Sequence, residues 1–250
     1  MALFHCTFKS KILEQAAQFN MIIPEECRED IPTVYLLHGL SGNQDDWIRY
    51  TSIERYANDH NMAVAMPSAD MSYFTDMKYG HKFFTYVSEE FIDYTRHTFR
   101  LSRKREKTFI GGMSMGGYGA LKIALSKPET FKAVASISGV TDIYYRFSIG
   151  GNEEAAKANW GENYLDQLKD TDNDLYVLAN RVVESRVDKP WIFQSIGTED
   201  YLYETNLRFK KFMDETDFVY EFHEGPGAHS WEVGDYWAKH AMDFFAKALK

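Results

Sequence analysis

The sequence predicts an α/β protein with a mostly parallel, doubly wound sheet. Two observations carry this prediction. Short apolar runs alternate with helical patterns along most of the chain, and the run at residues 33–37 is apolar almost throughout, as expected for a strand covered on both faces. A chain of 250 residues with 44% hydrophobic residues can also bury a large core without disulfides or metals. We therefore expect a single domain over residues 1–250.

Eight segments have strand-like composition. The second of them stops at Pro24, which is followed by an acidic turn. The predicted strands cover residues 3–9, 16–23, 33–37, 62–66, 108–110, 131–137, 191–196 and 218–222. Helical patterns follow at residues 53–58, 87–99, 117–125, 206–213 and 237–249. In the last of these helices, the apolar residues recur at spacings that place them on one face.

Residues 141–188 break the alternation, because they contain no good strand. Ten acidic and five basic residues give this segment a charge of −5, more than half of the total of −9. Glycine, asparagine and aspartate make residues 150–152 and 170–174 loop-like. We expect the segment to be an insertion that caps the carboxyl edge of the sheet; an ordinary solvated helical excursion is the alternative.

Charge and cysteine content restrict the partners and the compartment. With 28 basic and 37 acidic residues, the protein is a poor partner for nucleic acid or an anionic membrane. Cys6 and Cys27 are too few for a disulfide framework and wrongly spaced for zinc. We expect two buried free thiols, with a bond between the two cysteines as the alternative. The amino end lacks a signal-peptide pattern, and the apolar runs are far shorter than the ~20 residues of a membrane span. These features predict a cytoplasmic protein.

The chemistry is expected at Gly-Met-Ser-Met-Gly, residues 112–116. A predicted strand precedes this pattern and a predicted helix follows it, which is the setting of a nucleophile elbow. Glycines two positions before and after Ser114 would remove side chains that clash in the tight turn. We therefore predict that Ser114 is a nucleophile exposed at the sheet edge, above a helix amino end that favours negative charge.

A serine nucleophile needs a base, and the base needs an orienting carboxylate. Three histidines follow Ser114. His240 lies in the last predicted helix and His223 ends a predicted strand, whereas His229 occupies a glycine-rich loop from which it could reach the serine. We predict His229 as the base. Asp200 follows the penultimate strand and is preferred as the carboxylate, with Glu199 as the alternative.

An oxyanion hole completes the predicted site. One donor is the backbone N–H of Met115, directly after the nucleophile, and the second comes from an earlier loop at a strand end. The glycine-rich residues 38–43 provide such a loop, and Leu40 is the predicted donor. Trp47 and Trp231 are candidate walls of a substrate pocket, with plain core packing as the alternative for each.

Four segments together resemble a known family. They are His-Gly-Leu-Ser-Gly-Asn at 38–43 with the nearby Asp46 and Trp47, Gly-Met-Ser-Met-Gly-Gly-Tyr-Gly-Ala at 112–120, Gly-Thr-Glu-Asp-Tyr-Leu at 197–202, and Gly-Ala-His-Ser-Trp at 227–231. Over nearly its full length the chain resembles the esterase D or tributyrin-esterase group of α/β-hydrolases, which is related to S-formylglutathione hydrolases and bacterial mycolyltransferases. The resemblance implies an α/β-hydrolase fold with antiparallel N-terminal strands. It also implies hydrolysis of short-chain carboxylic esters by Ser114, His229 and Asp200, without a cofactor.

Other functions are weighed against this one. Acetyl-xylan and cinnamoyl or feruloyl esterases share similar motifs. Formylglutathione hydrolases usually carry histidine where this chain has Met113 and Tyr118, which counts against that activity. A non-catalytic binding protein on the same fold is the alternative of another class. His223 and His229 lack a third partner for a metal, and no loop has dinucleotide or P-loop spacing. We expect a small ester substrate and no metal, and a homo-oligomer is one alternative for the assembly. The acidic segment predicts that anionic esters are poorer substrates.

Overall fold

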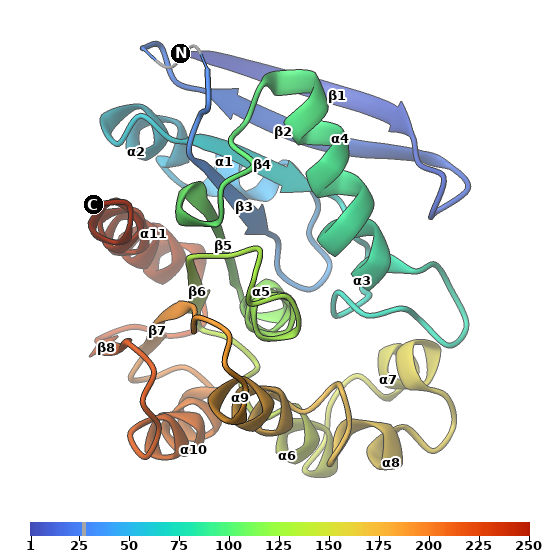
Figure 1. The fold of residues 1–250 in the computed structure, drawn as a ribbon. Helices are drawn as coiled ribbons and strands as arrows, with labels where there is room; N and C mark the ends of the chain where they lie inside the picture. Colours follow the sequence, from blue (N-terminus) through green and yellow to red (C-terminus); the bar gives the residue numbers. More distant parts are fainter. Residues whose placement is uncertain (27–28) are drawn as a thin grey trace.

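The computed structural model describes residues 1–26 and 29–250, and it contains one sheet of eight strands (Figure 1). The strands are β1 (Ala2–Lys9), β2 (Ala16–Ile23), β3 (Thr33–Leu37), β4 (Ala63–Pro67), β5 (Thr108–Met113), β6 (Ala133–Ile137), β7 (Trp191–Gly197) and β8 (Tyr220–Gly225). Their order across the sheet is β1-β2-β4-β3-β5-β6-β7-β8. β1 pairs antiparallel with β2 and β2 with β4, whereas β3 to β8 are parallel. The predicted α/β-hydrolase fold with antiparallel N-terminal strands is confirmed.

Helices cover both faces of this sheet (Figure 1). They are α1 (Asp46–Tyr50), α2 (Ile53–Asp59), α3 (Phe83–Thr85), α4 (Ile92–Phe99), α5 (Met115–Ser126), α6 (Ile143–Ser148), α7 (Glu153–Trp160), α8 (Tyr164–Leu168), α9 (Leu175–Glu184), α10 (Tyr203–Met213) and α11 (Trp231–Ala248). α1, α2 and α11 pack over one face and bury one apolar cluster; α4, α5, α9 and α10 enclose the larger cluster on the other. Every residue of β3 and β4 is buried, as the continuous apolar run predicted.

Several element boundaries differ from those expected. The helix predicted at 87–99 starts as α3, passes through a π-helical turn at Tyr86–Phe91 and continues as α4. β5 extends to Met113, because Gly111 and Gly112 continue the pairing with β3 and β6, and Met113 pairs with Ile137. Trp231, predicted in a loop, is the first residue of α11, because Ser230 before it has the extended backbone of an N-cap residue.

Residues 141–188 fold into four helices, α6 to α9, and contain no strand. Three of these helices begin at a side-chain cap. Asp142, Asn152 and Asp174 accept hydrogen bonds from backbone N–H groups in the first turns of α6, α7 and α9. These caps explain why the acidic, loop-like stretches lie between helices. In Figure 1, α7 and α8 lie together below α3, on the opposite side of the view from β7 and β8. The backbone N–H groups of Lys78 and Tyr79, in the segment before α3, donate to carbonyl oxygens at the end of α7. That residues 141–188 cap the site stays a prediction.

The structure tests the expected free thiol at one of the two cysteines and the expected lack of a membrane span. Cys6 is a partly buried free thiol whose pKa is raised by that burial. Cys27 lies outside the described residues. Across residues 1–26 and 29–250, no helix combines the length and the apolar character needed to cross a bilayer.

Candidate active site

Ser114 occupies a sharp turn between β5 and α5. Its backbone has φ 58° and ψ −119°, in the left-handed half of the map that L residues rarely adopt. A Cβ on Gly112 would lie 2.4 Å from the carbonyl carbon of Gly116, and a Cβ on Gly116 would lie 2.3 Å from the carbonyl oxygen of Leu37. Both positions therefore require glycine. This is the backbone of a nucleophile elbow.

Ser114, His229 and Asp200 form one hydrogen-bonded chain. His229 Nδ1 lies 2.8 Å from Asp200 Oδ2, and His229 Nε2 lies 2.9 Å from Ser114 Oγ. Because a carboxylate only accepts, the imidazole proton is on Nδ1, and Nε2 is left to accept the serine proton. The three side chains come from the loops after β7 and β8 and from the turn after β5. Parallel strands bring these ends to one edge of the sheet.

The carboxylate beside the histidine is Asp200, not Glu199. The Asp200 side chain is fully buried, and its second oxygen accepts the N–H of Leu202 at 2.9 Å. Glu199 instead accepts hydrogen bonds from the backbone N–H of Gly227 and from the Thr198 hydroxyl. The bond from Gly227 lowers the pKa of Glu199. Glu199 thus binds the backbone of the loop that carries His229, a role that sequence reasoning missed.

The two predicted oxyanion donors lie on segments that meet at the elbow. Met115 is the first residue of α5, so the helix itself does not use its N–H. Leu40 lies in the loop after β3, and a Cβ on Gly39, its neighbour, would lie 3.8 Å from Ser114 Cβ. β3 and β5 are paired at Leu37 and Gly112, which fixes this loop beside the serine.

His38 is a second residue that sequence reasoning did not assign. Its side chain is buried, its Nε2 accepts the N–H of Ala69 at 3.0 Å, and its Nδ1 lies 2.7 Å from the carbonyl oxygen of Gly39. Nδ1 therefore carries the proton and donates to that carbonyl. Burial lowers the pKa of His38, so the ring stays neutral. A buried neutral histidine thus fixes the backbone just before Leu40; the His-Gly pair after a strand was the available signal.

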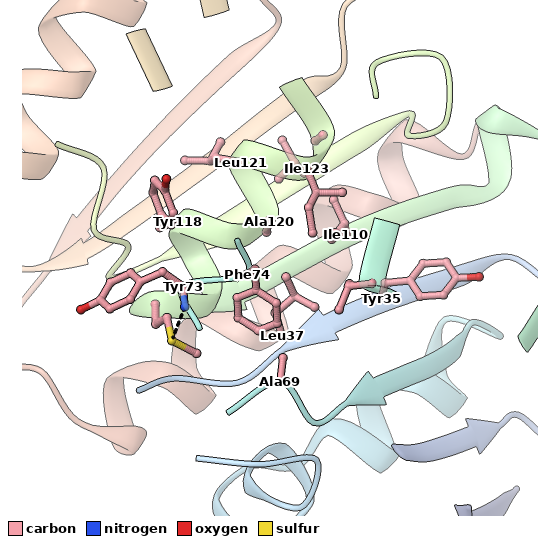
Figure 2. Close-up of a cluster of buried hydrophobic side chains, with 14 of the residues drawn as sticks. Tyr35, Leu37, Ala69, Tyr73, Phe74, Ile110, Tyr118, Ala120, Leu121 and Ile123 are labelled. Atoms are coloured by element: carbon pink, nitrogen blue, oxygen red, sulfur yellow. Dashed lines mark hydrogen bonds between the residues drawn. The ribbon is translucent and has the colours of Figure 1, made fainter. Parts of the chain in front are cut away.

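The side chains of Met115, Trp47 and Trp231, predicted to lie near the substrate, all pack against other residues of the protein. Met115 is fully buried, and its sulfur accepts the N–H of Tyr73 within the apolar cluster of Figure 2. Trp47 is fully buried and donates its indole N–H to the Leu37 carbonyl at 3.0 Å. Trp231 packs edge-on against Trp47 and stacks on Tyr50. Trp47 therefore supports the end of β3, just before the loop that carries Leu40. Contact of either tryptophan with substrate stays a prediction.

The other two histidines lie apart from the serine. His223 is inside β8 and stacks on Phe193, with its Nε2 3.3 Å from Glu221. His240 lies within α11 beside Tyr236. Within the described part of the chain, no group of three or more His, Cys, Asp or Glu side chains is placed to hold a metal ion.

Comparison with known proteins places this geometry in a family. The family model "Putative esterase" matches residues 10–247. An acetyl esterase of Caldicellulosiruptor saccharolyticus is 32% identical, with 98% of this chain and 97% of that protein aligned.

Two solved structures from Staphylococcus aureus cover 98% of both chains at 33% identity. One is the fluorophosphonate-binding serine hydrolase F with substrate bound, at a TM-score of 0.92, and the other is an S-formylglutathione hydrolase, at 0.89. The elbow, the hydrogen-bonded Ser–His–Asp chain and these matches lead to one conclusion: the chain belongs to the esterase family and is a carboxylic ester hydrolase.

Proposed function

We propose that the protein hydrolyses short-chain acyl esters through an acyl-enzyme on Ser114. The single observation that carries this proposal is the continuous hydrogen-bonded path from Asp200 through His229 to Ser114. In this arrangement His229 removes the serine proton as Oγ attacks the ester carbonyl. Asp200 holds the imidazole in the required tautomer and stabilises the imidazolium that forms.

Charge then develops on the carbonyl oxygen, and the backbone N–H groups of Met115 and Leu40 are proposed to stabilise it. His229 returns its proton to the departing alcohol oxygen, which leaves the acyl group on Ser114. A water molecule, deprotonated in turn by His229, attacks the acyl-enzyme. The acid product departs and Ser114 regains its proton. No cofactor takes part in this proposed sequence.

The relatives support a short acyl group. The acetyl esterase relative, 32% identical over nearly the full length of both chains, is named for a two-carbon acyl group. Each further CH₂ that fits a pocket adds at most ~0.8 kcal/mol, or about fourfold in kcat/KM, whereas one that collides loses more. S-formylglutathione hydrolysis is the second candidate, favoured by the similarity to such an enzyme from S. aureus. Acetyl-xylan and feruloyl esters are further candidates within the same reaction class.

A panel of acyl esters tests this proposal. We expect kcat/KM for para-nitrophenyl esters to rise from acetyl to propionyl or butyryl and to fall before octanoyl. Feruloyl esters and S-formylglutathione belong in the same panel, with Ser114→Ala as the blank. A steady increase through octanoyl would contradict a short acyl pocket. No hydrolysis of any ester would contradict the proposed function and favour a binding protein.

The remaining expectations extend this proposal. We infer a single domain in which residues 141–188 cap the site, a cytoplasmic enzyme, and no nucleic-acid partner. The eight-stranded sheet runs through both halves of the chain, which supports one domain. Subcellular fractionation tests the compartment. Sedimentation with and without DNA tests nucleic-acid binding, and sedimentation of the protein alone gives the oligomeric state.

A further inference from the structure

Tyr201 lies directly beside the proposed catalytic base. Its ring centre is 4.8 Å from the centre of the His229 imidazole, and 63% of the residue is exposed. Burial of the rest of the ring raises the pKa of Tyr201. The tyrosine therefore forms part of the solvent-facing rim of the site, in contact with the imidazole.

The position of Tyr201 indicates whether its ring borders the acyl portion or the alcohol portion of a bound ester. His229 must protonate the departing alcohol oxygen, so the alcohol portion leaves past the imidazole. A ring packed against that imidazole therefore borders the alcohol portion.

A cation from the 141–188 segment rests on this tyrosine. The guanidinium carbon of Arg146, in α6, lies 5.5 Å from the centre of the Tyr201 ring. Arg146 is half-buried and donates to the carbonyl oxygen of Gly150. Among the described residues, no carboxylate lies within ion-pair distance of Arg146, whereas Arg181 of the same segment pairs with Asp172. A partly desolvated arginine without a carboxylate is suited to bind an anion.

We infer that Arg146, held on the ring of Tyr201, binds a carboxylate carried by the alcohol portion of the ester. The inference rests on the proposed function and names the substrate class of the same site. Guanidinium forms paired, charge-assisted hydrogen bonds with carboxylate, and the ring beneath it limits its orientations. The segment as a whole carries a charge of −5, which predicts the opposite preference. At contact range a single cation outweighs a diffuse charge that salt screens.

The test compares para-acetoxybenzoate with its methyl ester at the ring carboxyl. Both are acetyl esters, and they differ in one negative charge on the alcohol portion. The two esters also differ in intrinsic reactivity. The readout is therefore kcat/KM for the charged ester divided by kcat/KM for the neutral ester, and this ratio is compared between the parent and each variant. Arg146→Gln should lower this ratio about tenfold. Arg181→Gln is the matched control, because it removes the same charge from the same segment, and its ratio should stay within twofold of the parent.

Tyr201 is tested by a second pair of variants. Tyr201→Phe keeps the ring and should keep the ratio, whereas Tyr201→Leu removes the platform and should lower it. The parent protein adds a measurement that needs no variant: its ratio should fall as salt is raised.

Three results would overturn the inference: an unchanged ratio in Arg146→Gln, an equal fall in Arg181→Gln, or a parent ratio that rises with salt. Hydrolysis of neither ester by the parent would instead overturn the proposed function, and this inference with it.

Discussion

Glu199 accepts a hydrogen bond from the backbone N–H of Gly227, two residues before the histidine that Asp200 contacts. Two adjacent carboxylates thus act on the same loop at different points. Asp200 is buried and holds the imidazole, whereas Glu199 is exposed and holds the backbone. The shorter aspartate reaches the imidazole, and the longer glutamate reaches the backbone of the loop.

This division of roles predicts unequal effects of removing each charge. Asp200→Asn should lower kcat on the order of 10⁴-fold, because an amide can donate to Nδ1 and so favour the wrong tautomer; the magnitude follows the known serine-protease case. Glu199→Gln keeps an acceptor for Gly227 and should cost far less. Steady-state kinetics on one acetyl ester measures both. The reverse ranking would assign the orienting role to Glu199.

Removal of the nucleophile should abolish the covalent path. Ser114→Ala leaves only binding and the oxyanion donors, so we expect a loss of roughly 10⁵ or more in kcat. A fluorophosphonate probe should label the parent at Ser114 alone, which mass spectrometry of the labelled peptide can check. Labelling of another residue, or an active Ser114→Ala protein, would contradict the assignment.

Two glycines near the elbow should respond differently to a methyl group. In Gly116→Ala the new Cβ would lie 2.3 Å from the Leu37 carbonyl oxygen and 2.6 Å from that of His38, so β3 and its loop must move. We expect a loss of about 1–3 kcal/mol or more in the free energy of unfolding. Gly39→Ala is the control, because its nearest contacts are at 3.8 Å. Urea unfolding of both variants measures the difference; equal losses would mean that the loop adapts freely.

Lys122 should make stability depend on pH. Its ammonium group is buried in α5, where it donates to Thr75 Oγ1 at 2.8 Å and Asn173 Oδ1 at 2.7 Å, and burial lowers its pKa to about 7 from 10.5. Between these values the unfolded chain binds the extra proton. The free energy of unfolding should therefore rise with pH across this window, by up to about 1.4 kcal/mol per unit from this group.

Lys122→Met removes the titrating group, so this contribution to the pH slope should disappear. Lys127→Met is the control, since Lys127 is partly exposed and pairs with Glu89 at 2.9 Å. Chemical unfolding at several pH values from neutral to alkaline measures the slopes. The same slope in Lys122→Met and in the parent would show that Lys122 keeps its proton when folded.

The parts of the structure that were predictable share a local cause. Continuous apolar runs mark buried strands, and this is why β2 and β3 begin and end where the sequence places them. The elbow was predictable because its glycines flank the serine between a predicted strand and a predicted helix, although the steric constraint on Gly116 comes from the distant Leu37 and His38 carbonyls. The candidate triad residues could be chosen because the loops that follow parallel strands all begin at the same, carboxyl edge of the sheet.

The parts that escaped prediction depend on contacts between distant segments. No local pattern shows that Glu199 would bind Gly227, that His38 would accept the N–H of Ala69, or that Arg146 would rest on Tyr201. The π-helical turn before α4 is equally invisible in a helical repeat. Helix starts at capping side chains, such as Asn152 and Asp174, were readable in principle but lay in stretches interpreted as loops.

The left-handed backbone of Ser114 also bears on how the chain evolves and can be engineered. Only glycine adopts such a conformation without steric cost, and a non-glycine residue there costs about 1–3 kcal/mol. Selection for thermal stability alone would therefore favour glycine at the position of the proposed nucleophile. A screen for stability alone will therefore enrich inactive variants with glycine at position 114. A useful screen must select for heat resistance and catalytic turnover together.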